Sequence, residues 1–172
     1  DTSNNEIIGD SFDIAVYLDR TYLDDRTLIP PGTEGRHKAF NIQADAVFTA
    51  FVILLVHGMP LNPETAHKTH ATFAQRAGVR SWDDFAVRGE ERVLKLVSFK
   101  AALEEFAKIY RRRDMGPFLE GDTPMYADLI VGAWLQFVKR TLPAEEWSQV
   151  QAWQDGLWGA LDRALEQYAQ VK

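Results

Sequence analysis

The sequence predicts a mainly α-helical protein, and three features support this. Apolar residues recur at three- and four-residue spacing in several long stretches, which is the period of an amphipathic helix. Residues 121–140 are apolar almost throughout and should form a helix at the centre of a bundle. Only residues 6–8 have a strand-like pattern, and a lone strand cannot satisfy its backbone. This strand would therefore pair with a segment upstream of the chain, or fray.

The N-terminal part predicts one helix followed by a linker. A helix over residues 11–22 would begin at Asp10 or Ser11, since both side chains accept hydrogen bonds from first-turn N–H groups. Its apolar face would be Ile14, Ala15, Leu18 and Tyr22. Residues 24–36 are charged and then rich in proline and glycine, which indicates a linker and a domain boundary.

The middle of the chain predicts two long helices joined by a long connection. The first spans about 35–57, since its second half is free of charge and Gly58 and Pro60 follow it. Residues 59–88 are less periodic and contain a short helix at about 64–76. A second amphipathic helix spans about 89–113 and ends before Gly116–Pro117.

The last part predicts the central helix and the end of the bundle. Pro124 suits a first helical position, and Asp128 is placed to accept hydrogen bonds from N–H groups at the helix start. We expect Asp128 and Trp134 to be buried. Pro143 begins the final region, where residues 147–171 hold one long or two short helices.

The composition of the 172 residues limits the function classes. There are 19 basic and 25 acidic residues, a net charge of −6, which argues against a nucleic-acid partner. Without cysteine there is no disulfide, thiolate metal site or cysteine nucleophile. No signal peptide or membrane-spanning segment is evident, so we expect a cytoplasmic protein that does not insert into membranes.

Two sets of residues could belong to a functional site, but a purely structural role explains each set better. Glu64, His67 and His70 are spaced by three, as metal ligands on one helix could be, but a solvated surface explains them better. A second set of apolar residues belongs to the bundle core or lines an apolar pocket beside the linker; it comprises Phe48, Phe51, Leu55 and Met125.

Residues 9–11 carry the strongest local hint of a binding site. Asp10 and Ser11 could be a simple helix cap. They could equally present a carboxylate and a hydroxyl to a small zwitterion, since N–H groups at a helix start attract a carboxylate and Asp10 would take an ammonium. The residues alone leave both interpretations open.

Three segments together resemble glutathione transferases. The segment GDSFDIAVYLDRTY resembles the end of their thioredoxin-like domain, and Leu28–Ile29–Pro30 is similar to their interdomain stretch. Residues 121–128, a glycine and a polar turn with an aspartate seven residues on, resemble the capping segment of their central helix. MYADLIVGAW and the tryptophan-rich C-terminus look most like fungal etherase-related and fungal-specific class A members.

The resemblance implies a division of the chain and a function. Residues 1–25 would be the last strand and helix of a thioredoxin-like domain, 26–36 the linker, and 37–172 the all-helical C-terminal domain. The function implied is attack of the glutathione thiolate on hydrophobic aromatic electrophiles by a homodimeric enzyme, with glutathione as co-substrate at Asp10 and Ser11. The alternative is a transferase-like protein that binds hydrophobic molecules without turnover.

Two departures from the family pattern affect these expectations. The usual capping serine or threonine is replaced by Met125, so Thr123 would cap the central helix instead. The first part of the thioredoxin-like domain, which carries the thiol-activating residue and a cis-proline, has no counterpart in this sequence. We therefore assign no catalytic residue and expect the chain alone to be inactive.

Overall fold

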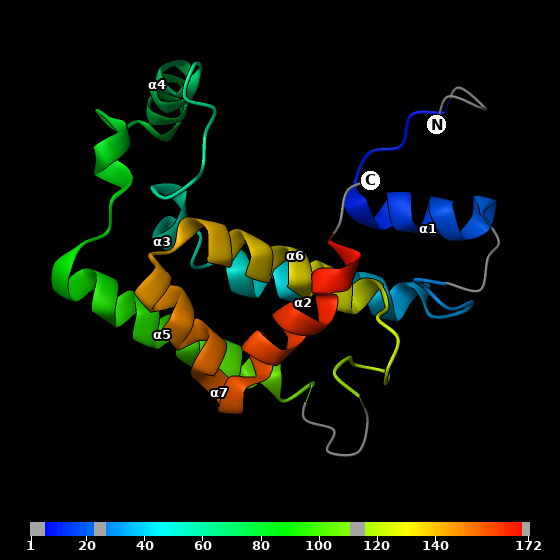
Figure 1. The fold of residues 1–172 in the computed structure, drawn as a ribbon. Coiled ribbons are helices and arrows are strands. Elements are labelled where there is room, and N and C mark those ends of the chain that lie inside the picture. Colours follow the sequence, from blue (N-terminus) through cyan, green and yellow to red (C-terminus); the bar gives the residue numbers. More distant parts are fainter. Residues whose placement is uncertain (1–5, 23–26, 111–115, 170–172) are drawn as a thin grey trace.

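The computed structural model describes residues 6–22, 27–110 and 116–169, and it is built of helices (Figure 1). No β-strand forms within these residues; Phe118 and Gly121 make an isolated bridge. The predicted mainly α class is confirmed. The elements in chain order are α1 Ser11–Thr21, α2 Glu34–Thr49, α3 Ile53–Val56, α4 Ala66–Ala77, the 3-10 helix η1 Trp82–Phe85, α5 Gly89–Ala107, α6 Tyr126–Thr141, α7 Ala144–Leu165 and the 3-10 helix η2 Glu166–Tyr168.

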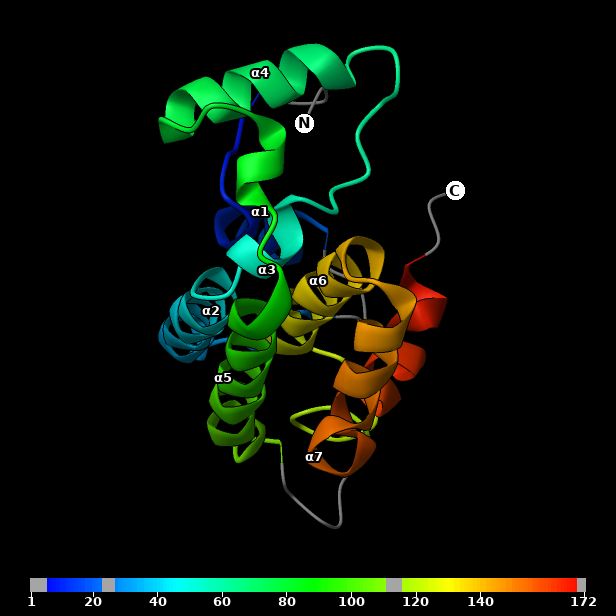
Figure 2. The ribbon, with the colours of Figure 1, turned by 90° about the vertical axis from the view of Figure 1, so that its left-hand side faces the viewer.

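Helix α6 is the centre of the bundle, as its apolar sequence predicts. It packs against α2 on one side and α7 on the other, and α5 closes the bundle against both (Figure 2). Val131, Leu135 and Val138 lie on one stripe of α6 and are fully buried. Trp134 is only partly buried, contrary to expectation, because its ring lies at the side of α6 and stacks on Phe48 at 5.4 Å.

The start of α6 is organised by the buried carboxylate of Asp128. Its Oδ2 accepts a hydrogen bond from the Met125 N–H and its Oδ1 accepts one from the Leu119 N–H, both at 3.0 Å. The burial of Asp128 is confirmed, with 0% of its surface exposed. The expected roles of Pro124 and Thr123 are wrong: the cap residue is Met125, because the Asp128 carboxylate takes up its N–H.

Two long helices are interrupted, and of these the sequence indicated a break only in the last region, as one of two alternatives. The segment expected as one helix over 35–57 breaks after Thr49, where the N–H groups of Phe51 and Val52 bond three residues back. Helix α7 bends at residues 153–156, where Gln154 has a φ of 50°. The Gln154 amide fixes this bend, because it donates to the Lys100 carbonyl and accepts from the Trp158 ring N–H.

Helix α4 and η1 form an arm that stands away from the bundle (Figures 1 and 2). The short helix predicted in the long connection is therefore present, and it contacts η1. The arm has its own aromatic cluster, in which the Trp82 ring stacks on His70 at 4.3 Å and meets Phe85 edge-on.

The N-terminal residues pack on the start of α6. Phe12 and Ala15 of α1 form a small core with Ile29 and Tyr126. The Asp19 carboxylate holds the linker by accepting the N–H groups of residues 28 and 29 at 3.0 and 2.6 Å. The strand expected at residues 6–8 is not formed, since no partner strand lies within the described residues and Ile7 is 99% exposed.

None of the helices in the described ranges combines the length and apolar character that a membrane span requires.

Candidate functional site

The first candidate site is the exposed start of α1. Asp10 caps this helix, because its Oδ1 accepts a hydrogen bond from the Phe12 N–H at 2.9 Å. Its backbone has φ 72° and ψ 129°, a conformation that side-chain-bearing residues rarely adopt. The Asp10 side chain is 54% exposed, so the carboxylate that caps the helix also faces solvent.

Asp10 is ionised at neutral pH. The Phe12 N–H and the ammonium of Lys38 both favour the charged form and lower the pKa of the carboxyl. Lys38 reaches across from α2, with its Nζ 3.6 Å from Asp10 Oδ1 and 4.7 Å from the centre of the Phe12 ring. The site therefore presents one anion and one cation side by side.

Ser11 is joined to the bundle through Tyr126. The two hydroxyl oxygens are 3.2 Å apart, and the Tyr126 hydroxyl donates to Asn41 Oδ1 at 2.9 Å. Because the Tyr126 hydroxyl has a single hydrogen, Ser11 must be the donor in their shared bond. This series of hydrogen bonds continues from Asn41 to Asp45. Asp45 also accepts a hydrogen bond from the Trp134 ring N–H at 2.8 Å.

These groups suit a small zwitterion. The Asp10 carboxylate can accept hydrogen bonds from an ammonium, and the Ser11 hydroxyl can turn from Tyr126 to donate to a carboxylate. An N–H group at a helix start adds a preference for an anion. Burial raises the pKa of the Tyr126 hydroxyl, so this residue stays neutral and acts through its hydrogen bonds.

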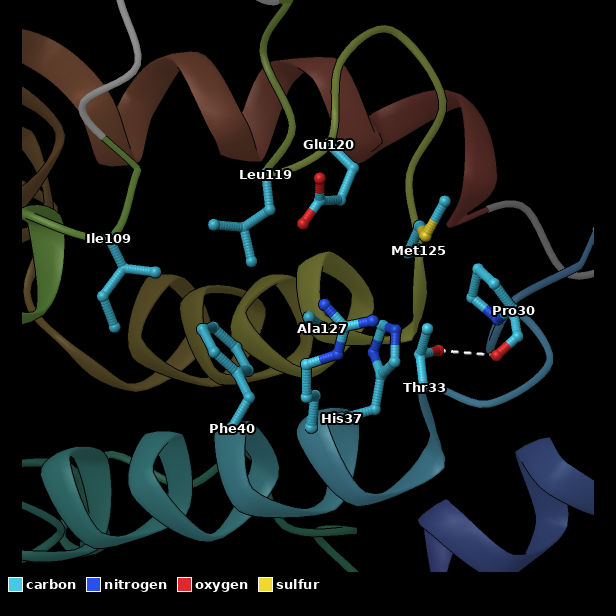
Figure 3. A pocket seen from close by; sticks show the side chains of 10 residues that line it. Pro30, Thr33, His37, Phe40, Ile109, Leu119, Glu120, Met125 and Ala127 are labelled. Atoms are coloured by element: carbon cyan, nitrogen blue, oxygen red, sulfur yellow. Dashed lines mark hydrogen bonds between the residues drawn. The ribbon is translucent and has the colours of Figure 1, made fainter.

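The second candidate site is a cavity of about 340 Å³ beside the linker (Figure 3). It opens between the start of α2, the end of α5 and the loop before α6. Its walls are mostly apolar, with a few polar groups among them, as in ligand pockets generally. The lining residues are Pro30, Thr33, Arg36, His37, Phe40, Ile109, Leu119, Glu120, Met125 and Ala127.

The four residues considered for a substrate pocket occupy different places. Met125 lines the cavity (Figure 3). Phe48 and Leu55 are 0% and 1% exposed in the bundle core, so they do not line it. Phe51 packs on Phe99 at 5.0 Å, with its side chain partly buried. A helical stripe of apolar residues indicates a buried face but cannot tell core from cavity.

The histidines considered for a metal site have other surroundings. Glu64 precedes α4, and His70 stacks on Trp82. In the described part of the chain, no three histidine, aspartate or glutamate side chains are grouped so that they could hold a metal ion.

Sequence reasoning missed Lys38, Tyr126 and His37 as site residues. Lys38 and Tyr126 reach the start of α1 from distant parts of the chain; Tyr126 is 115 residues from Ser11. His37 lines the cavity with its Nδ1 buried and without a partner in the described ranges. The only signal in the sequence was their position in the first turns of two helices that were expected to pack together.

Comparison with known proteins identifies the fold. A protein-family model described as the C-terminal domain of glutathione S-transferase matches residues 37–168. Two glutathione S-transferases of Ceriporiopsis subvermispora, each solved in complex with glutathione, are similar in structure. The first has a TM-score of 0.87 and 30% identity, and covers 100% of this chain and 70% of its own. The second has a TM-score of 0.81 and 28% identity, and covers 97% of this chain and 69% of its own.

A glutathione transferase from Phanerochaete chrysosporium has a TM-score of 0.82 at 21% identity, which shows a shared fold; it covers 100% of this chain and 69% of its own. No curated protein sequence matches. The family match covers most of the bundle and the structural match covers all of the chain. This chain therefore belongs to the glutathione S-transferase family, whose C-terminal helical domain it contains.

Proposed function

We propose that the protein is a glutathione transferase that binds the γ-glutamyl end of glutathione at the start of α1. Asp10 pairs with the ammonium, while the Ser11 hydroxyl and the helix start receive the carboxylate. The observation that carries the proposal is the exposed, ionised Asp10 beside Ser11 at a helix start, in a chain of this family. Lys38 lies close enough to add a cation for the ligand carboxylate.

The second substrate in this proposal is a hydrophobic aromatic electrophile. The glutathione thiolate attacks its electrophilic carbon, a carbon–sulfur bond forms, and the leaving group departs with the bonding electrons. The cavity lined by Met125 and Phe40 supports this substrate class, because its walls are mostly apolar. The etherase-related or fungal-specific class A subtype stays a prediction from the MYADLIVGAW segment.

The alternative is a transferase-like protein that binds hydrophobic molecules without turnover. One observation favours it: a mostly apolar cavity lies beside the linker. An assay with glutathione and an aromatic electrophile such as 1-chloro-2,4-dinitrobenzene separates the two. Conjugation above the uncatalysed rate supports the enzyme, and dye binding without conjugation supports the carrier.

We further propose a homodimer. Helix α5 has three apolar residues at its outer surface, Val93, Leu94 and Val97, which are 59%, 59% and 62% exposed. A patch of this kind is typical of surfaces that contact another protein. Sedimentation velocity should show a dimer that Val97→Glu dissociates, while a monomer at all concentrations would contradict the proposal.

The test of the glutathione site is a calorimetric titration with two ligands. Glutathione contains the γ-glutamyl group and cysteinylglycine lacks it, so their affinities isolate the group that Asp10 and Ser11 are proposed to bind. We expect glutathione to bind at least tenfold more tightly, since an ion pair and charge-assisted hydrogen bonds are lost with the smaller ligand. Equal affinities would overturn the assignment of this site.

A further inference from the structure

The cavity beside the linker has one wall suited to a flat apolar ligand. Phe40, Ile109, Leu119, Met125 and Ala127 line it, and they come from α2, the residues just after α5, the loop before α6 and the first turn of α6 (Figure 3). Its volume of about 340 Å³ is near the lower end of the range for small-molecule pockets. A ligand of one or two aromatic rings is the size that such a space accepts.

The polar side of the cavity favours an anion. Arg36 lines it, and no ion pair to Arg36 is found within the described residues. Glu120 lines it as well, but that side chain already has an interaction of its own. Both charged side chains line the same cavity as the His37 ring. The guanidinium is therefore the charged group available to a ligand.

His37 adds a neutral polar group. Burial lowers the pKa of its imidazole, so the ring is uncharged at neutral pH, and one ring nitrogen donates while the other accepts. Its Nδ1 is buried and has no hydrogen-bond partner among the described residues. A ligand oxygen or hydroxyl that forms a hydrogen bond with this buried nitrogen removes the cost of leaving it unpaired, and so stabilises the bound state.

We propose that this cavity binds a small aromatic molecule carrying one carboxylate. The ring lies against Phe40, Leu119 and Met125, the carboxylate pairs with the Arg36 guanidinium, and His37 bonds a polar atom beside the ring. The inference rests on the proposed function only where this ligand is taken to be the substrate. Binding itself requires no glutathione.

One residue, Tyr126, contacts residues of both the cavity and the proposed glutathione site. The Tyr126 ring meets the His37 ring edge-on at 6.5 Å, while its hydroxyl bonds Ser11. A ligand against His37 and a ligand at the start of α1 would therefore both lie close to Tyr126. Each site is tested with its own ligand.

The experiment compares two probes of the same shape, of which only one is charged. 2-Naphthoate carries the carboxylate and 2-naphthamide is its uncharged counterpart; both are titrated calorimetrically into the protein without glutathione. We expect naphthoate to bind about tenfold more tightly, the effect of one charge-assisted pair. Arg36→Gln should remove this difference and leave amide binding unchanged. Arg76→Gln, at an exposed position on α4 far from the cavity, is the matched control and should bind both probes like the wild type.

A second variant tests the location of the ring. Ala127→Leu places three extra carbons at the cavity wall, so it should weaken both probes by about the same factor. Equal binding of the two probes to the wild type, no binding of either, or an unaltered preference in Arg36→Gln would each overturn the proposal. Glutathione titrated into the same variants reports separately on the start of α1, so failure at one site is distinguishable from failure at the other.

Discussion

The hydroxyl of Tyr126 lies 3.2 Å from the hydroxyl of Ser11 and joins the first helix to the centre of the bundle. Tyr126 donates its one hydrogen to Asn41, so Ser11 donates to Tyr126 in this structure. A ligand carboxylate at Ser11 has to compete with Tyr126 for that hydrogen. Tyr126 therefore both positions Ser11 and occupies the hydrogen that Ser11 would donate to a ligand.

Tyr126→Phe separates these two effects. The ring keeps its edge contact with Phe12, but Asn41 Oδ1 is left buried without a donor. We expect a loss of roughly 1–3 kcal/mol in the free energy of unfolding, measured by urea denaturation. Glutathione affinity should stay the same or rise, because the Ser11 hydroxyl is released. Tyr168→Phe, at a half-exposed position, is the control; a fall in glutathione affinity with Tyr126→Phe would contradict this account.

Replacing Asp128 should destabilise the protein by removing a buried acceptor. Asp128→Ala leaves the N–H groups of Met125 and Leu119 without their present acceptor. We expect this to lower the free energy of unfolding by roughly 1–3 kcal/mol. For a domain of this size that corresponds to about 2–4 °C in melting temperature per kcal/mol. Asp122→Ala, in the same loop and exposed, should stay within about 0.5 kcal/mol of the wild type.

The effect of Asp128 should depend on pH. Burial raises the pKa of Asp128 above its usual value of 3.8, although its backbone hydrogen bonds act in the opposite direction. The folded state therefore binds this proton more tightly than the unfolded state, and the resulting stability is present below pH 3.8 and lost as the pH rises through the folded-state pKa. The stability difference between wild type and Asp128→Ala should shrink on going from pH 3.5 to pH 7. A difference that widens would contradict the sign of this shift.

Arg92 and Glu146 tie the starts of α5 and α7 together. The guanidinium donates to both carboxylate oxygens at 2.6 Å, and the two side chains are 20% and 16% exposed. Arg92 also donates to the carbonyls of Leu54 and Val87, which would remain its partners in Glu146→Gln. Arg92→Met should therefore destabilise the protein more than Glu146→Gln. A double-mutant cycle should give a coupling energy of about 0.5–3 kcal/mol, and additive effects would argue against the pair.

The helices were predictable where local sequence decides the structure. The apolar run and Asp128 fix α6 because a buried helix needs both its packing face and an acceptor for its first N–H groups. The break after Thr49 was not predictable, since no glycine or proline marks it. The strand-like pattern at residues 6–8 forms no strand in the described structure, because a strand depends on a partner that local pattern cannot supply.

The candidate site was predictable in part for the same reason. Asp10 and Ser11 are recognisable because a helix cap has a local signature. Lys38 and Tyr126 meet them only after α2 and α6 have packed beside α1, so no spacing in the sequence reports the contact. The cavity is likewise assembled from separate parts of the chain, and the sequence suggested one of its lining residues, Met125, from its place at the start of the central helix.

Asp10→Asn tests whether the carboxylate only caps α1. Asn caps a helix about as well as Asp, so the melting temperature should change little. Loss of the charge should weaken glutathione binding about tenfold or more, as measured by calorimetry. Asp13→Asn removes a charge from the first turn of the same helix and should leave the affinity close to that of the wild type. Equal affinity for Asp10→Asn and wild type would leave the cap as its role.

Asp10→Gly extends the test to the strained backbone of this residue. At φ 72° a side chain costs on the order of 1–3 kcal/mol, whereas glycine adopts this conformation freely. Losing the cap to glycine costs a few tenths of a kcal/mol, so the variant should be as stable as the wild type or more stable. Its glutathione affinity should nevertheless fall at least as far as that of Asp10→Asn, because the ammonium has lost its partner. A more stable protein with weaker glutathione binding would show that the strain at Asp10 is retained for the ligand. A clear loss of stability would show instead that the cap outweighs the strain.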